Sequence, residues 1–238
     1  MIKDNDNNVT PDNDDQRNDD NPPDNDTLLV SSIFCSIQGE STSQGAITSF
    51  IRLCGCNLNC NYCDTRWSHE GGEEISIQKI IETVTEHKSK YVTVTGGEPL
   101  LQQNTQKLLT ALTKLNYKTS IETNGTADIK GINKNTRIVM DIKCPDSLMS
   151  EHNDLQNINY LKDTDELKFV LSSTSDYNWA KSMIEKFDLA EKCTVLMSPV
   201  WEKLSPKKLA ELILKDKLNV RLNLQLHKII WENDGKEH

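Results

Sequence analysis

The 238-residue sequence lacks any run of about 18 consecutive apolar residues, so it offers no candidate for a membrane-spanning helix. The N-terminus lacks the basic and apolar regions of a secretory signal peptide. No stripe of lysines and arginines is present that would indicate a nucleic-acid interface. We therefore expect a cytoplasmic protein that binds neither a membrane nor a nucleic acid.

Negative charge is concentrated at the start of the chain. Residues 1–26 hold nine Asp and seven Asn against Lys3 and Arg17, which gives a formal charge of -7. The whole chain carries -9, which leaves only -2 for the remainder. A segment with so few apolar side chains cannot bury enough surface to order itself. We predict a disordered acidic tail over 1–26 and one folded domain over 27–238, long enough to form a hydrophobic core.

Strands and helices alternate along the predicted domain. Apolar and β-branched runs predict strands at 28–35, 47–53, 91–95, 117–122, 137–142, 166–171, 193–197 and 220–226. Helical spacing predicts helices after Ser76, through 108–115, over 176–187 and after Ser205. This alternation predicts an α/β fold with a parallel sheet covered by helices, in an open or partial barrel of the TIM type. The candidate motifs follow predicted strands, where such barrels build their sites.

Three cysteines, Cys56, Cys60 and Cys63, have the spacing C-x3-C-x2-C. Three thiolates on one tight loop can hold three irons of a 4Fe–4S cluster and leave the fourth iron open for chemistry. With Cys54 they could instead close a structural zinc site, although zinc sites usually use paired C-x2-C knuckles or histidines and only His69 is near. We favour the cluster and do not expect Cys54 to be a ligand, because it breaks the spacing.

The other cysteines indicate no disulfide framework, since seven is an odd number and no secretory leader is visible. We expect Cys35, Cys144 and Cys193 to be small strand or buried residues.

The sequence Gly96-Gly97-Glu98-Pro99 directly follows a predicted strand. Paired glycines let the backbone approach a ligand closely, and Glu98 could accept hydrogen bonds from an ammonium group. Alone, this pattern more often marks a simple turn. Together with the cysteine triad it resembles the radical S-adenosylmethionine (SAM) superfamily over residues 50–100. The resemblance implies a 4Fe–4S cluster whose open iron binds SAM, cleavage of SAM to a 5′-deoxyadenosyl radical, and an electron donor of the flavodoxin or ferredoxin type.

Flanking motifs narrow this resemblance. They are Ser36 to Glu40, Phe50 to Arg52, Cys63 to Thr65, Thr95 to Pro99, Glu122 to Thr126, Asp141 to Pro145, Leu167 to Val170 and Gln225 to His227. Together they resemble the 7-carboxy-7-deazaguanine synthase family from Ser36 to Trp231. That family implies a partial (β/α)6-type barrel, a homodimer and a radical SAM carbon–nitrogen lyase. The implied reaction converts 6-carboxy-5,6,7,8-tetrahydropterin to 7-carboxy-7-deazaguanine with loss of ammonia, in the biosynthesis of 7-deazapurine nucleosides such as queuosine.

The predicted substrate site combines this resemblance with side-chain chemistry. A pterin presents an edge of donors and acceptors that Gln38 and the backbone of Ile37 and Gly39 could bind. The planar fork of Arg52 suits the substrate carboxylate, and the family pattern adds Thr95. No protein side chain is clearly implied as a general base.

The predicted cofactor site rests mainly on the resemblance. A hydroxyl such as that of Thr65 is a suitable Mg²⁺ ligand, and the resemblance implies a magnesium ion between Thr65 and the substrate, although the sequence alone would also allow a helix cap. The family pattern places these residues against SAM: Tyr62, Cys63, Asp64, Gly97, Asp141, Ile142, Lys143, Met197, Ser198, Pro199 and Val200. Two roles stay open. His227 either lines the barrel mouth or packs, and Glu122 either binds ribose hydroxyls or caps a turn.

Two other functions fit parts of the sequence. A glycyl-radical enzyme activase also carries C-x3-C-x2-C, but it acts on a protein backbone and has little use for the polar turn at 36–40. A zinc-stabilised binding module would leave 96–99 and 122–125 without a role. Iron content separates the zinc module from the enzyme.

Overall fold

The computed structural model describes residues 26–231, which contain one sheet of nine strands in the order β3-β1-β2-β4-β5-β6-β7-β8-β9. The strands are β1 Thr27–Ile37, β2 Ile47–Leu53, β3 Glu73–Ser76, β4 Tyr91–Gly96, β5 Lys118–Thr123, β6 Arg137–Ile142, β7 Glu166–Leu171, β8 Thr194–Pro199 and β9 Arg221–Leu222. From β2 through β4 to β9 neighbouring strands pair in parallel, whereas β1 is antiparallel to β2 and β3. The sheet keeps two edges, so the barrel is open, which confirms the predicted fold class.

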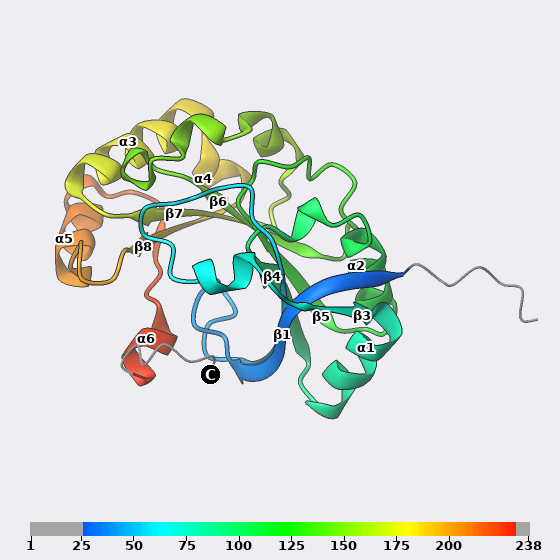
Figure 1. The fold of residues 1–238 in the computed structure, drawn as a ribbon. Coiled ribbons are helices and arrows are strands. Elements are labelled where there is room, and N and C mark those ends of the chain that lie inside the picture. The colour runs from blue at the N-terminus through cyan, green and yellow to red at the C-terminus, as the bar shows by residue number, and fades with distance from the viewer. Residues whose placement is uncertain (1–25, 232–238) are drawn as a thin grey trace, which may run out of the picture.

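Helices cover the outer side of the curved sheet (Figure 1). They are α1 Ile77–Glu86, α2 Thr105–Lys114, α3 Thr174–Phe187, α4 Leu189–Lys192 and α5 Pro206–Asp216, whereas α6 Leu226–Ile230 lies apart from them in Figure 1. The 3-10 turns are η1 Arg66–His69, η2 Pro99–Leu101, η3 Pro145–Ser147, η4 Ser150–His152 and η5 Leu155–Tyr160. The predicted caps Ser76 and Ser205 are confirmed, because each side chain accepts a hydrogen bond from the amide three residues on.

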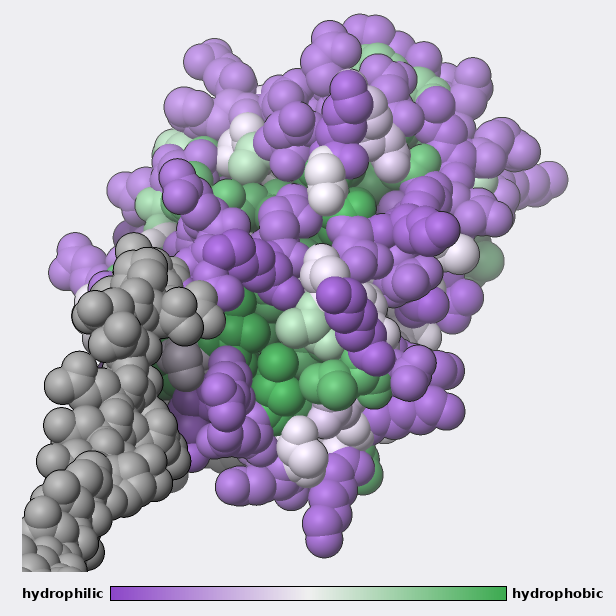
Figure 2. Space-filling view, turned by 90° about the vertical axis from the view of Figure 1, so that its right-hand side faces the viewer, coloured by the Kyte–Doolittle hydropathy of each residue, from purple (hydrophilic) through white to green (hydrophobic). Residues whose placement is uncertain are grey.

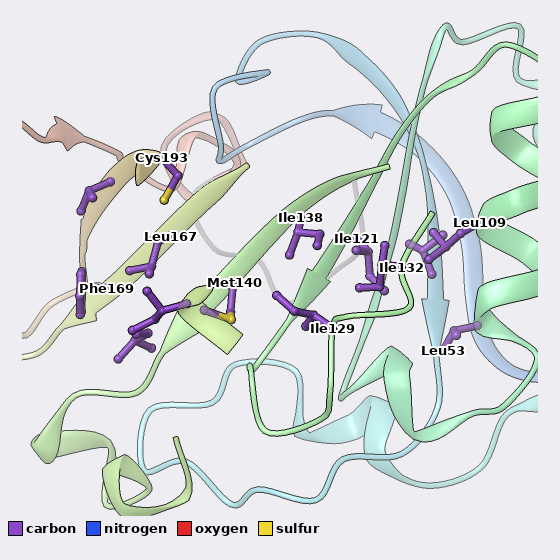
Figure 3. Close-up of a cluster of buried hydrophobic side chains, with 14 of the residues drawn as sticks. Leu53, Leu109, Ile121, Ile129, Ile132, Ile138, Met140, Leu167, Phe169 and Cys193 are labelled. Carbon is purple, nitrogen blue, oxygen red and sulfur yellow. The ribbon is translucent and has the colours of Figure 1, made fainter. Parts of the chain in front are cut away.

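The hydrophobic core lies between the sheet and these helices. Along β7, Leu167 and Phe169 join the core, while Lys168 and Val170 face the inside of the barrel. Figure 3 shows strand residues such as Ile121 and Leu167 on this core side, with Leu109 of α2 packed among them. On the outer face in Figure 2, polar side chains predominate around a smaller apolar area, as expected for amphipathic helices. Strand alternation therefore reserves the inner face of the barrel for polar chemistry.

Central strands match the prediction, while the sheet edges do not. The bounds 47–53, 137–142 and 166–171 are those of β2, β6 and β7. Strand β3 was not predicted. The strand predicted at 220–226 exists as β9 but is much shorter, because β9 stops after two residues and α6 begins at Leu226. The chain turns away from the sheet after the Asn223 amide donates to the Met197 carbonyl (2.9 Å), and the Leu226 amide then donates to the Gly39 carbonyl (2.9 Å). His227 consequently lies on a helix.

Other predictions agree with the structure only in part. Leu115 follows α2 and is 53% exposed, so it does not belong to the apolar face of that helix. Cys144 and Cys193 are buried, whereas Cys35 lies on β1 but is exposed. The predicted tail falls almost entirely outside the described residues, and its last residue, Asp26, forms an ion pair with Lys107. Within residues 26–231 no helix has the length and apolar character needed to cross a membrane.

Candidate active site

A cavity of about 340 Å³ lies at the carboxyl ends of the parallel strands, where barrels of this type bind ligands. Fifteen sequence-predicted site residues line it: Ile37, Gln38, Gly39, Arg52, Cys56, Cys60, Tyr62, Cys63, Asp64, Thr65, Thr95, Gly97, Asp141, Lys143 and Val200. Four others, Ile142, Met197, Ser198 and Pro199, are buried outside this lining. A contact between these four and SAM would have to come from their backbone, and it stays a prediction.

The cysteine loop forms one side of the cavity, which we call the cluster-loop wall (Cys56, Cys60 and Cys63). Burial raises the pKa of Cys56 and Cys60, so both are protonated thiols at neutral pH, and metal binding would release their protons. Within 26–231 no three His, Cys, Asp or Glu side chains converge as the ligands of one metal ion do. Three thiols spread around one cavity fit a cluster better, because each thiolate there binds a different iron.

The cluster loop is held in place by bonds to its neighbours. The Cys54 thiol donates to the Gly71 carbonyl (3.0 Å), which agrees with its predicted exclusion from the ligand set. The Asn61 amide donates to the Ser147 carbonyl (3.0 Å). The Tyr62 hydroxyl donates to the Val170 carbonyl (3.3 Å), which fixes the ring across the end of β7. In Figure 1 this loop passes in front of the strand ends.

Gly97 allows the turn after β4 to touch the cluster loop. A Cβ atom at this position would lie 2.1 Å from the Gly55 carbonyl oxygen and 2.6 Å from the Cys56 Cβ, so only glycine fits without movement. The neighbouring Glu98 does not play its predicted role toward an ammonium group. Its carboxylate is fully buried and accepts hydrogen bonds from Leu100 N (3.0 Å) and Asn124 N (2.6 Å), so it organises the turn.

The polar turn after β1 also lines the cavity, through Gln38, Gly39 and Glu40. Gln38 is 3% exposed, its side-chain oxygen accepts from the Glu40 amide (3.0 Å), and its nitrogen donates to the Thr93 hydroxyl (3.3 Å). The Gln38 side-chain amide is thus engaged within the protein, as are its backbone amide, which donates to Ala46 O (2.8 Å), and its carbonyl, which accepts from Gly45 N (2.9 Å). His227 lies directly against Gly39, where an added Cβ would meet its Nδ1 at 2.1 Å.

Arg52 stands between two aromatic rings. Its guanidinium carbon lies 5.9 Å from the Phe34 ring centre and 5.6 Å from that of Trp67, and Phe34 stacks on Phe50 at 5.1 Å. Aromatic faces attract a cation and hold its plane, so the rings orient the guanidinium fork. Phe34 and Trp67 both line the cavity but were missed from the sequence, since nothing local distinguishes them from core residues.

Five ionisable side chains form what we call the charged wall: Glu40, Glu122, Asp141, Lys143 and Lys168. Asp141 pairs with Lys143 (3.1 Å) and Lys168 (3.2 Å), and Lys168 also pairs with Glu40 (2.5 Å). Burial raises the pKa of Glu122, whose carboxylate accepts a hydrogen bond from the Thr95 hydroxyl (2.8 Å). Glu40 and Lys168 were not among the predicted contacts, although a lysine inside an apolar strand could have indicated Lys168.

The rim of the cavity includes α6 and the segment after the triad. The Lys228 ammonium pairs with Asp64 (2.5 Å), which ties α6 to the cluster loop. Thr65 precedes η1 but makes no side-chain cap, and its hydroxyl lies 3.8 Å from the Cys63 sulfur. The alternative of Thr65 as a helix cap is therefore not adopted.

Comparison with known proteins shows the family to which this chain belongs. The radical SAM superfamily model matches residues 50–166. The chain is 41% identical over 212 residues to 7-carboxy-7-deazaguanine synthase of Chlorobaculum tepidum, across 88% of this chain and 96% of that protein. It belongs to the 7-carboxy-7-deazaguanine synthase family.

Other relatives of that family agree. The synthase of Clostridium acetobutylicum is 40% identical over 206 residues, across 83% of this chain and 93% of that protein. The crystal structure of QueE from Escherichia coli, at 20% identity, has the same fold, with a TM-score of 0.71 over 84% of this chain and 95% of that one. Family membership brings a 4Fe–4S cluster and SAM to the cavity, and the predictions of a zinc module and of a glycyl-radical activase are set aside.

Proposed function

We propose that this chain converts 6-carboxy-5,6,7,8-tetrahydropterin to 7-carboxy-7-deazaguanine with loss of ammonia, in the biosynthesis of 7-deazapurine nucleosides of the queuosine and archaeosine type. One observation carries the proposal: the cluster-loop wall, the polar turn, Arg52 and the charged wall all line a single cavity. Its volume, about 340 Å³, suits a small polar molecule beside a cofactor.

Cys56, Cys60 and Cys63 would hold the cluster in this proposal. When bound, the cluster and SAM supply the 5′-deoxyadenosyl radical that begins the reaction. The protein's part is placement: Gly97 keeps the turn after β4 against the loop, and Asp141 and Lys143 line the same cavity. Loss of ammonia from the tetrahydropterin is redox-neutral overall, so no net oxidant is required.

Substrate recognition would depend on groups that already have fixed orientations. The planar fork of Arg52, held between Phe34 and Trp67, matches a carboxylate in two parallel hydrogen bonds. The backbone of Ile37 and Gly39 offers donors and acceptors for the pterin edge. Thr95 lies beside Glu122 at the end of the neighbouring strand, within the same lining.

We also propose a Mg²⁺ ion between Thr65 and the substrate carboxylate. The support is that the Thr65 hydroxyl lines the cavity and is not used as a helix cap. A hydroxyl oxygen is a normal ligand for this hard cation. Turnover by Thr65→Ser should keep its dependence on Mg²⁺, whereas Thr65→Ala should need a higher Mg²⁺ concentration; equal dependence in both variants would contradict the assignment.

The partners of the enzyme belong to the same proposal. A flavodoxin or ferredoxin in the cytoplasm would supply the electron. A second copy of the chain would cover the apolar side chains of Ile47, Ile229 and Ile230, which are 60%, 49% and 48% exposed. Ile47 and Trp231 line a common hollow, which places Ile47 near the residue that follows α6. Sedimentation of the wild type against Ile47→Glu tests the homodimer.

An anaerobic turnover assay tests the function. The iron-reconstituted protein is mixed with SAM, reductant, Mg²⁺ and the carboxylated tetrahydropterin, and products are identified by mass spectrometry. We expect 7-carboxy-7-deazaguanine and ammonia from the wild type and neither from Cys60→Ala. Release of 5′-deoxyadenosine without the deazaguanine would keep the radical chemistry but overturn the substrate.

A further inference from the structure

Lys168 is a buried cavity residue to which none of the roles above has been given. It lies in the middle of β7, is 6% exposed, and lines the cavity. A lysine at such a position needs partners, because an isolated buried ammonium group is costly. Its partners here are the carboxylates of Glu40 at 2.5 Å and Asp141 at 3.2 Å.

These two carboxylates come from distant parts of the sequence and meet at the Lys168 ammonium group. Asp141 stands next to Lys168 on β6, in direct register. Glu40 belongs to the polar turn after β1, 128 residues away in the sequence. The other oxygen of Glu40 accepts a hydrogen bond from the Gln225 side chain (2.8 Å), which leads into α6. Lys168 thus connects the polar turn to the strands that carry the predicted SAM contacts.

The charges around Lys168 show why its ammonium group matters. Three carboxylates, Glu40, Glu122 and Asp141, share the wall with Lys168 and Lys143. Lys143 already pairs with Asp141. Burial opposes ionisation of Glu40, but the charge and hydrogen bond of Lys168, aided by His227 and Gln225, lower its pKa to about 2. Without Lys168 the Glu40 carboxylate would lose its nearest cation.

We propose that Lys168 is a positioning residue for the pterin site: it anchors Glu40, and through it the backbone of residues 37–39, to Asp141. This inference rests on the proposed function, because it names the residue that sets the pterin-binding turn. Three atoms define it, the Lys168 Nζ and one carboxylate oxygen on each side. Lys168 acts through Glu40, so its loss should weaken pterin binding more than it slows the bound substrate.

The test uses the cluster-loaded enzyme with Lys168→Met, Lys168→Arg and a matched control, Lys162→Met. Lys162 is also ion-paired, to Asp165 at 3.3 Å, and donates to the Thr136 carbonyl (3.0 Å), but it lies outside the cavity. Kinetics with the pterin give KM and kcat for each variant between pH 5 and pH 8. Iron content and SAM affinity are measured in parallel.

For Lys168→Met we expect KM for the pterin to rise by on the order of tenfold or more, with a smaller change in kcat. A pH effect should accompany it. In the wild type Glu40 stays ionised over the whole range, so KM is flat on the acid side. Without Lys168 the pKa of Glu40 rises, so KM should grow further as the pH falls toward 5. Lys168→Arg should restore most of the affinity, and Lys162→Met should match the wild type.

A pterin KM near the wild-type value and flat with pH in Lys168→Met would overturn the inference and leave the proposed function intact. An equal loss in Lys162→Met would also overturn it. If Lys168→Met does not fold, Glu40→Gln gives the answer, since a normal KM there contradicts any role for the Lys168–Glu40 pair. A wild type that never binds the pterin overturns the proposed function, and this inference with it.

Discussion

The two walls of the cavity differ in how strongly their side chains are already bonded to other groups of the protein. On the cluster-loop wall the cysteines make only weak hydrogen bonds to sulfur: Cys56 lies 3.5 Å from the Leu58 amide, and Cys63 lies 3.9 Å from a His69 ring nitrogen. On the charged wall Lys168 and Asp141 are joined to partners at 2.5 to 3.2 Å. One wall is shaped to be completed by a bound cluster, and the other is preorganised before any ligand arrives.

The largest effect should come from adding one methyl group at a glycine beside each wall: Gly97, which contacts the cluster loop, and Gly39, which precedes Glu40. In Gly97→Ala the new Cβ meets backbone, the Gly55 carbonyl at 2.1 Å, so the cluster loop must shift. Because a displacement of about 1 Å can cost on the order of a hundredfold in rate, we expect a loss of that size, with reduced iron content. In Gly39→Ala the clash is with the His227 side chain, which can rotate away.

The measurement compares the iron content and the pterin affinity of these two alanine variants. Gly39→Ala should keep its iron and lose pterin affinity, whereas Gly97→Ala should lose iron first. Iron assays and SAM-dependent release of 5′-deoxyadenosine separate the two outcomes. Normal iron and activity in Gly97→Ala would show that the turn and the loop are less tightly packed than the structure has them.

The preorganisation of the charged wall predicts a pH-dependent stability. The pKa of Glu40 is about 2 in the folded chain against an ordinary 4.5, and its side chain is 15% exposed. A lowered carboxyl pKa stabilises the fold above pH 4.5, and this contribution is lost as the pH falls from 4.5 toward 2. The shift corresponds to about 3 kcal/mol.

Urea unfolding of the cluster-free chain checks this value. Glu40→Gln should be less stable than the wild type by up to about 3 kcal/mol at pH 7, and the gap should narrow on acidification. The partly exposed pair Lys79–Glu82 on α1 is a control, since Glu82→Gln should change stability little at any pH. A gap that stays constant between pH 7 and pH 3 would contradict the assigned ionisation of Glu40.

The sequence could predict those parts of the fold that depend on local residues, but not those that depend on contacts with distant segments. Strands β2, β6 and β7 are largely buried and rich in apolar and β-branched residues, so their bounds could be predicted without reference to other segments. Strand β3, with Glu73 and Glu74 exposed, forms only because the β1 edge lies beside it. Residues 223–226 leave the sheet to meet the polar turn, a contact that alternation along the chain cannot reveal.

The site residues that belong to local motifs could be predicted, whereas those that depend on distant partners could not. The cysteine triad and the Gly96-Gly97 turn are local patterns, and their residues do line the cavity. The charged wall depends on pairs such as Lys168 and Glu40, which are 128 residues apart. The Gln38 side chain matched a motif, but its amide serves the turn itself. Motifs therefore located the site, while the partners of each side chain required the fold.

A smaller effect is expected at the aromatic support of Arg52. Removing one ring in Trp67→Leu takes away one cation–π contact at 5.6 Å, worth about 0.5 to 1 kcal/mol at an exposed site. We expect a several-fold rise in KM for the carboxylated pterin. Affinity for a tetrahydropterin without the carboxylate should not change, because Arg52 has no carboxylate to bind there.

Trp201→Leu is the matched control for Trp67→Leu. Trp201 is also partly exposed, at 36%, but it does not line the cavity. Equal losses for both pterins in Trp67→Leu would indicate a general packing defect and not orientation of the Arg52 fork.

The smallest effect tests whether hydrogen bonds to a neighbouring segment hold the cluster-loop wall in place, in addition to the bound cluster. The Asn57 side chain donates to the Thr126 hydroxyl (2.8 Å) and accepts from the Asn124 side chain (3.0 Å), which links the loop to the segment after β5. Each net hydrogen bond contributes about 1 kcal/mol, less at an exposed position. Asn57→Ala should therefore lose iron to a chelator only a few-fold faster than the wild type, with pterin KM unchanged. Asn59→Ala, an exposed asparagine on the same loop, should release iron at the wild-type rate. Equal rates for the two variants would mean that the bound cluster alone holds this wall, in line with its weak sulfur contacts. The hydrogen bond from Asn57 to Thr126 would then add nothing.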